Sequence, residues 1–273
     1  MIFTLMSYNV ERGFHSREHH LERHRLEAAQ RIVRQVNPDI LALTEANYGG
    51  LNSQGVRMDY QQIFGFSYGQ WGGYRVFGPR HGDEGGNCLL SSFPLQAEVI
   101  NFSHKGAVRG RITLKEHDLE EKIVTVAVVH PSYSIDDNMK ISELRTLLEN
   151  RKEPYLLTGD FNTLHPDDVY DYDELVKEFA AFDQQEVHKM FDNWKKAECV
   201  SWILQQGLVD AFLPESRQST VPTFYAYGRK QKGVRLDFTF HSTGLKVKEA
   251  YVLKNEDTEI ASDHYPIVVK FEI

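Results

Sequence analysis

Short apolar runs recur along the chain and predict buried strands. Residues 40–43 and 124–129 are almost entirely apolar, a pattern typical of strands that are covered on both faces. Residues 265–273 alternate instead, which predicts a strand with its apolar side chains on one face. The same reasoning predicts further strands at 155–159, 235–241 and 246–253.

Helical periodicity fills the stretches between these strands. Apolar residues recur at helical spacing in 26–36, where Asn37-Pro38 ends the repeat, and again in 141–149. Residues 167–206 contain few β-branched residues and several apolar triplets at helical spacing, which predicts a helical insertion. Strands and helices therefore interleave, so we predict a single α/β (α+β) domain over residues 1–273.

Composition excludes several other classes of protein. The 273 residues include 2 cysteines, Cys88 and Cys199, which is too few for a disulfide scaffold or a cysteine-based zinc cluster. No apolar run approaches the roughly 20 residues that span a bilayer, and the N-terminus carries no basic leader. We therefore expect a cytoplasmic protein. The formal charge of −8 argues against passive binding to a polyanion, although a local basic patch or a bound cation would still recruit phosphate.

Polar side chains stand at the ends of six predicted strands. A single Asp or Asn in such a place is usually a turn residue that bonds its own backbone. Six together indicate a site, because a buried carboxylate or imidazole needs partners. Their carboxylates and amides suit Mg²⁺ or Mn²⁺ and their imidazoles suit proton transfer, whereas the absence of a thiolate disfavours zinc. These residues are Asn9, Glu45, His130, Asp160, Asn162, Asp237, Asp263 and His264.

The order of these motifs resembles the endonuclease/exonuclease/phosphatase superfamily over nearly the whole chain. Gly-Asp-Phe-Asn at 159–162 and Ser-Asp-His-Tyr-Pro at 262–266 carry most of the resemblance, together with Thr44-Glu45 and Arg-Leu-Asp-Phe at 235–238. The resemblance implies a four-layered α/β/β/α sandwich, in which two mixed sheets are flanked by helices and the active site lies at one edge.

The resemblance also implies which residues bind a divalent cation. Glu45 is the implied direct ligand, and Asn9 and Asp263 lie close to the cation directly or through water. Mg²⁺ takes one or two carboxylates and keeps several waters, which agrees with this set. Glu11 occupies a place where some relatives carry Asp or Asn, but we interpret it as a solvated loop residue.

Catalytic roles follow from the same resemblance. Asp160 matches the residue that orients or deprotonates the attacking water, and Asn162 the residue that binds the phosphate. His264 is implied to contact a phosphate oxygen while Asp237 holds its imidazole in one tautomer. His130 supplies a second imidazole where AP endonucleases place tyrosine, and this departure disfavours an AP endonuclease.

Relatives also place a phosphate-facing arginine ahead of the strand at 112–114. We assign that role to Arg109, with Arg111 as the alternative register.

These observations predict a Mg²⁺- or Mn²⁺-dependent hydrolase that cleaves phosphoesters by in-line attack of water. A nuclease is favoured by the basic loop Arg229, Lys230 and Lys232 and by the aromatic residues Trp71, Tyr74 and Phe77, although both segments are also compatible with an ordinary solvated turn and loop packing. The alternative is a phosphatase or a sphingomyelinase-like diesterase, which the charge of −8 favours. A catalytically silent nucleic-acid-binding relative would lack the side chains that this sequence retains.

Overall fold

The computed structural model describes residues 1–18, 20–47, 58–75, 84–115, 120–179, 190–228 and 232–273. Its strands form two six-stranded sheets. The first sheet has the order β11 (Lys246–Val252), β12 (Ile267–Glu272), β1 (Ile2–Asn9), β2 (Ile40–Thr44), β4 (Glu84–Ser91) and β3 (Tyr68–Arg75). The second has the order β5 (Leu95–Asn101), β6 (Gly106–Leu114), β7 (Lys122–Val129), β8 (Tyr155–Asp160), β10 (Asp237–His241) and β9 (Val209–Asp210).

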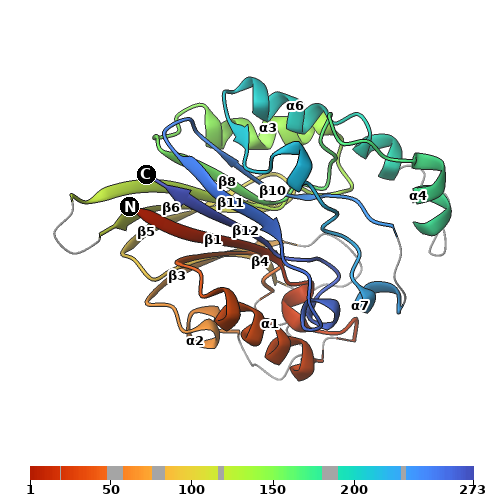
Figure 1. Ribbon diagram of the computed structural model, residues 1–273, viewed down its shortest axis with the longest axis horizontal. Helices are drawn as coiled ribbons and strands as arrows, with labels where there is room; N and C mark the ends of the chain where they lie inside the picture. Colours follow the sequence, from red (N-terminus) through yellow and green to blue (C-terminus); the bar gives the residue numbers. More distant parts are fainter. Residues whose placement is uncertain (19, 48–57, 76–83, 116–119, 180–189, 229–231) are drawn as a thin grey trace.

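Helices cover the outer faces of both sheets, so the molecule has four layers (Figure 1). On the first sheet lie α1 (Arg23–Val36), α2 (Tyr60–Phe64) and α8 (Thr258–Ala261), and on the second lie α3 (Asp137–Leu148) and α6 (Glu198–Gln205). Both sheets are mixed, because β1 runs parallel to β2 and β7 parallel to β8 while their other neighbours are antiparallel. The predicted α/β/β/α sandwich is confirmed.

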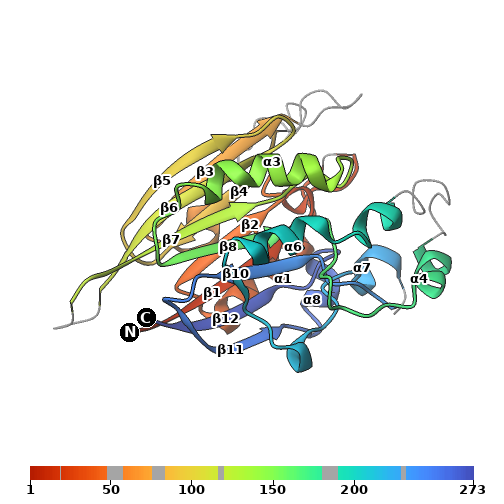
Figure 2. The ribbon, with the colours of Figure 1, turned by 90° about the horizontal axis from the view of Figure 1, so that it is seen from above.

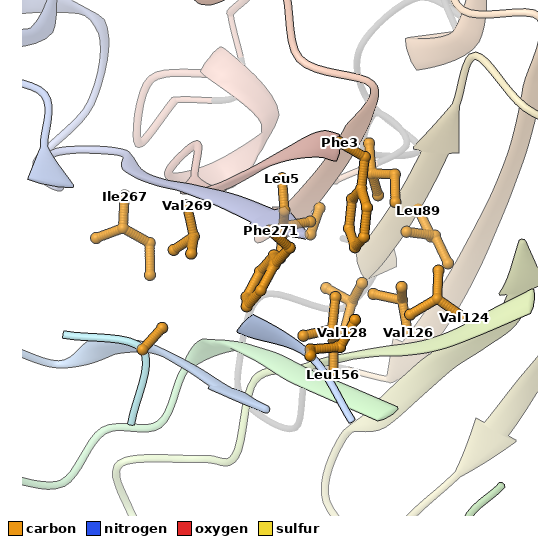
Figure 3. Close-up of a cluster of buried hydrophobic side chains, with 14 of the residues drawn as sticks. Phe3, Leu5, Leu89, Val124, Val126, Val128, Leu156, Ile267, Val269 and Phe271 are labelled. Carbon is orange, nitrogen blue, oxygen red and sulfur yellow. The ribbon is translucent and has the colours of Figure 1, made fainter. Parts of the chain in front are cut away.

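The main core lies between the two sheets (Figure 3). Phe3 and Phe271 stack on the first sheet with their ring centroids 5.5 Å apart, and the second sheet contributes Val126, Val128 and Leu156. All five side chains are buried, and each contributes roughly 1.5–3 kcal/mol when it leaves water. This packing fixes the two sheets against each other and therefore sets the distance between residues that the site draws from each.

The predicted C-terminal end of helix α1, at Asn37-Pro38, is confirmed. Ala29, Ile32 and Val33 are buried against β1 and β2. The helix ends at Asn37, whose left-handed φ of 48° lets its N–H bond the Val33 carbonyl. Pro38 follows and cannot continue the helix.

Helix α3 starts one turn earlier than its apolar pattern predicts. Asp136 caps it by accepting a hydrogen bond from Met139 N at 2.9 Å. Three buried residues of its first two turns are charged: Asp137, Lys140 and Glu143. A search for apolar periodicity therefore misses this end of the helix.

The segment predicted as a helical insertion contains α4 (Tyr172–Phe179) and α6, and its residues 180–189 lie outside the described part. α4 and α7 (Phe224–Tyr227) lie at one end of the sandwich, away from the chain termini (Figures 1 and 2). None of the described helices is long and apolar enough to cross a bilayer.

The strand pairing brings all the polar strand ends to one edge of the sandwich. Asn9 pairs with Thr44 in the first sheet, and Val129 pairs with Gly159 in the second. β10 begins at Asp237 directly opposite Asp160. Gly159 has φ 140°, and a Cβ there would collide with the Val129 carbonyl oxygen, so glycine is required where β8 passes β7.

Candidate active site

Asp160 lies at the centre of the converging polar groups. Asn9 Nδ2 donates to its Oδ2 at 3.1 Å across the gap between the two sheets. The Nε2 atoms of His130 and His264 lie 3.4 Å and 3.7 Å from the same oxygen. His130 Nε2 is also 3.8 Å from Oε1 of Glu45. Residues from both sheets thus meet around one carboxylate oxygen.

These neighbours keep Asp160 ionised. Burial alone would raise its pKa, but a hydrogen bond with His130 and the charge of His264 lower the pKa well below its usual range. The backbone N–H of Asn162 donates to the other oxygen, Oδ1, at 2.9 Å. Both oxygens of this carboxylate therefore have fixed directions.

His264 is paired with a buried carboxylate. Its Nδ1 lies 2.8 Å from Oδ2 of Asp237, so this ring nitrogen carries the proton and Nε2 is directed towards Asp160. Burial disfavours the charged imidazole, yet Asp237 and Asp263 raise the pKa of His264 well above its usual value. The neighbouring carboxylates therefore favour the protonated, cationic ring.

Three further carboxylates crowd the edge formed by the first sheet. Burial and the charge of Asp263 raise the pKa of Glu11 to about 8. Burial and the charge of Glu45 likewise raise the pKa of Asp263. Glu11 is partly buried and lies 3.2 Å from the Arg25 guanidinium, so its interpretation as a solvated residue is wrong. Mutual repulsion of this kind is what a divalent cation relieves, so the donor set fits such an ion.

Two site residues have left-handed backbones. Glu45 has φ 52° and Asn162 has φ 48°, a conformation that costs a residue such as glutamate about 1–2 kcal/mol and that asparagine adopts more readily. Arg12 N donates to Glu45 Oε2 at 3.2 Å, and Asn162 Nδ2 donates to the Pro131 carbonyl at 3.0 Å. Strain of this kind persists only where surrounding contacts hold it, and here it lies at the proposed reacting centre.

Arg109 does not join this cluster. It pairs with Ala127 in the middle of the β6–β7 ladder, and its guanidinium lies 2.7 Å from Glu98 on the neighbouring strand β5. It lines a separate groove with Arg111 and Lys152. The assignment of Arg109 beside the reacting phosphate is therefore wrong, because the register carries its side chain away from the strand end.

Lys105 is the cation that the sequence analysis missed. Its Nζ lies 3.0 Å and 2.9 Å from the two ring nitrogens of His130, and Tyr74 Oη lies 3.3 Å from His130 Nδ1. Burial lowers the pKa of Lys105 to about 8. The lysine occupies a polar turn before β6, so no break in an apolar pattern marks it, and the structure brings it to the site because β6 pairs with β7, which ends one residue before His130.

Glu143 of α3 holds the turn that carries Lys105. Its Oε1 accepts from the backbone N–H of His104 at 3.1 Å and lies 3.1 Å from His104 Nδ1.

The segments that favour nucleic acid are only partly described. Trp71 Nε1 donates to the Ala46 carbonyl at 2.6 Å, so this indole bonds the loop that follows Glu45. Lys232 forms an ion pair with Glu174 of α4. Phe77, Arg229 and Lys230 lie outside the described residues.

With this geometry established, comparisons with known proteins identify the family. The profile of the Endonuclease/Exonuclease/phosphatase family matches residues 6–264, so the chain belongs to that family. A comparison with curated protein sequences found no match.

Solved structures with the same fold cover the whole chain. An endonuclease/exonuclease/phosphatase from Beutenbergia cavernae is 19% identical, with a TM-score of 0.69 over 100% of this chain and 72% of that one. A family protein from Leptotrichia buccalis is 18% identical, with a TM-score of 0.66 over 99% of this chain and 100% of that one. ANGEL2, a 2',3'-cyclic phosphatase solved with adenosine-2',3'-vanadate, is 16% identical, with a TM-score of 0.60 over 99% and 95%.

Proposed function

We propose that this chain is a divalent-metal-dependent hydrolase of phosphoesters and that its substrate is a phosphodiester of nucleic acid. The observation that carries the proposal is the convergence of Asn9, His130 and His264 on the Asp160 carboxylate, beside the repelling carboxylates Glu45 and Asp263. Family membership supports the phosphoester chemistry.

Mg²⁺ or Mn²⁺ would be held by Glu45 and Asp263, with Asn9 close by. No group of three or more His, Cys, Asp or Glu side chains in the described ranges is arranged to hold an ion, so water and substrate oxygens would complete the coordination. When bound, the cation would neutralise negative charge on the phosphate.

The side chains of the protein have different roles around the phosphorus atom of the substrate. Asp160 orients the attacking water, and its low pKa makes orientation a larger contribution than proton abstraction. The His264 imidazolium, held by Asp237, donates from Nε2 to a phosphate oxygen. His130 faces the phosphate or the leaving group.

Phosphate binding is completed by Asn162 and by a lysine. One hydrogen of the Asn162 amide bonds the Pro131 carbonyl, and the second is available for a phosphate oxygen. Lys105 takes the role first assigned to Arg109, because it is the cation in contact with His130.

A second candidate is a phosphatase or a sphingomyelinase-like diesterase. The pairing of Lys232 with Glu174 favours it, since the described part of the basic loop then has no spare charge for a polyanion. ANGEL2, at 16% identity, shows the fold and does not choose between the two candidates.

We further propose that residues 1–273 act as one catalytic domain with a helical insertion at 167–206, because the site uses residues from Asn9 to His264. The free, buried cysteines Cys88 and Cys199 support a reducing, cytoplasmic location.

A substrate panel tests the proposal. Plasmid DNA, abasic duplex, RNA, inositol phosphates and sphingomyelin are incubated with Mg²⁺ or Mn²⁺ and then with excess EDTA. We expect hydrolysis of DNA or RNA that EDTA abolishes, that Glu45→Ala removes, and that the surface control Lys152→Ala leaves unchanged. Full turnover in EDTA would contradict the metal assignment, and cleavage of only sphingomyelin or inositol phosphates would establish the second candidate.

A further inference from the structure

A buried ion pair lies directly beneath the active site. Lys140 of α3 is fully buried, and its Nζ lies 3.2 Å from Oδ1 of Asp137, which is also buried. Asp137 Oδ2 in turn accepts the Cys199 N–H at 3.1 Å. Desolvating two such charges carries a penalty of several kcal/mol per ion, and an apolar pair would fill the same space without that penalty.

The second partner of Lys140 belongs to the site. Its Nζ donates to the main-chain carbonyl of Asn162 at 2.6 Å. Asn162 has a left-handed φ of 48°, a conformation that asparagine adopts more readily than other non-glycine residues, and the bond from Lys140 fixes the carbonyl of this turn. A charge-assisted hydrogen bond of this length is among the stronger polar contacts that a protein makes.

The orientation of this turn controls two functional groups. The N–H of Asn162 fixes Asp160 Oδ1 at 2.9 Å, and its Nδ2 reaches the Pro131 carbonyl beside His130. A rotation of the residue therefore moves both the water-orienting carboxylate and the amide that faces the phosphate. A misplacement of about 1 Å at a reacting centre can lower the rate about 100-fold.

We propose that Lys140 is a positioning residue for the proposed hydrolysis: its ammonium holds the 160–163 turn in the reactive conformation, and Asp137 holds the ammonium. The inference rests on the proposed function for its catalytic consequence. The turn geometry that it explains is independent of the substrate.

Kinetics of a small activated diester, bis(p-nitrophenyl) phosphate, test the proposal. Lys140→Met should lower kcat about 10- to 100-fold with KM changed less than twofold, and Lys140→Arg should restore most of kcat because it keeps the charged donor. In the double variant of Lys140→Met and Asn162→Ala, the fold-loss of kcat should be well below the product of the two single losses. Lys152→Met, on the surface, is the matched control.

A second variant separates positioning from folding. Asp137→Asn with Lys140→Met removes both buried charges and leaves no unpaired carboxylate, so it should fold and still lose kcat. Asp137→Asn alone leaves the buried Lys140 ammonium without its counter-ion, so it should lower both kcat and the free energy of unfolding.

Hydrogen–deuterium exchange gives a readout that needs no substrate. In Lys140→Met the amides of 160–163 should exchange faster, while those of α1 stay as protected as in the wild type. A wild-type kcat in Lys140→Met, losses that multiply with Asn162→Ala, or unchanged exchange at 160–163 would each overturn the positioning role. An inactive wild type would refute the proposed function, and exchange would still decide the inference.

Discussion

His264 and Asp237 share one hydrogen bond of 2.8 Å, and this predicts that they act as one catalytic unit. Asp237→Asn weakens the charge that keeps the imidazole protonated, and His264→Ala removes the imidazole itself. Since the same interaction cannot be lost twice, the double variant should have the kcat/KM of the worse single variant within about threefold. The measurement is kcat/KM of the four proteins on one diester. Penalties that multiply would show that Asp237 acts elsewhere.

The pKa of Lys105 predicts a basic limb in the pH profile. Burial lowers this pKa to about 8, so the ammonium is present below pH 8 and lost above it. If Lys105 binds the phosphate, kcat/KM should fall as pH rises through 8. Arginine stays charged at any accessible pH, so Lys105→Arg should shift this limb upwards. The same limb in Lys105→Arg and wild type would assign it to another group.

The residues that sequence reasoning found and missed differ in one physical respect. Asn9, His130 and Asp160 break an apolar strand pattern, and a polar residue in that place is visible as an exception. Lys105 stands in a polar turn, where another charged side chain is no exception. The misplacement of Arg109 has a different cause, because the depth of a residue within a sheet depends on strand register, and one sequence does not reveal register.

At the scale of elements, Arg25 ties α1 to two segments of the site. Its guanidinium is fully buried and donates to the carbonyls of Val10 at 3.3 Å, Glu11 at 3.2 Å and Ala261 at 3.0 Å. Asn9 immediately precedes the first of these segments, and Asp263 follows the second within two residues. One side chain thus sets the spacing between two proposed metal-binding residues.

Removal of this buried cation should destabilise the protein strongly. Arg25→Met leaves three carbonyls and the Glu22 carboxylate without their donor and the Glu11 carboxylate without its ion-pair partner, so the free energy of unfolding should fall by about 3–5 kcal/mol. Arg31→Met on the same helix removes an ion pair with Asp257 in which the arginine side chain is 48% exposed, and it should change the free energy of unfolding far less. Urea unfolding of both variants provides the comparison. Equal losses would mean that Arg25 does not hold these segments.

Helix α3 shows where pattern reasoning reaches its limit for an element. Its later turns carry Leu144, Leu147 and Leu148 and were predicted. Its first turns bury Lys140 and Glu143, which hold the turns of Asn162 and Lys105. A helix face that positions an active site is polar and buried at once, and apolar periodicity does not detect such a face.

At the scale of the whole molecule, the site exists only where the two sheets pack together. Glu45 and Asp263 come from the side of the first sheet, and His130 and Asp160 from the second. Folding therefore brings together carboxylates that repel, and burial with this repulsion raises the pKa of Glu11 to about 8 and that of Asp263. Because the pKa of Glu11 is raised from 4.5 to about 8 in the folded state, the folded protein binds more protons at this group than the unfolded chain between about pH 4.5 and pH 8. The stability contributed by this group thus falls as pH rises across that window.

This linkage predicts how a divalent cation stabilises the protein. An ion that binds only the folded state at 100 times its Kd adds about 2.7 kcal/mol, which raises the Tm of a chain this size by roughly 5–10 °C. The rise should be larger at pH 8 than at pH 5.5, because Glu11 holds a proton at the lower pH and that proton opposes binding of the cation. Differential scanning calorimetry with Mg²⁺, Mn²⁺ and excess EDTA measures this rise in Tm. Glu45→Ala should lose the rise, and Lys152→Ala should retain it. A shift of equal size in Glu45→Ala would place the cation elsewhere, and a shift that does not depend on pH would separate it from Glu11 and Asp263.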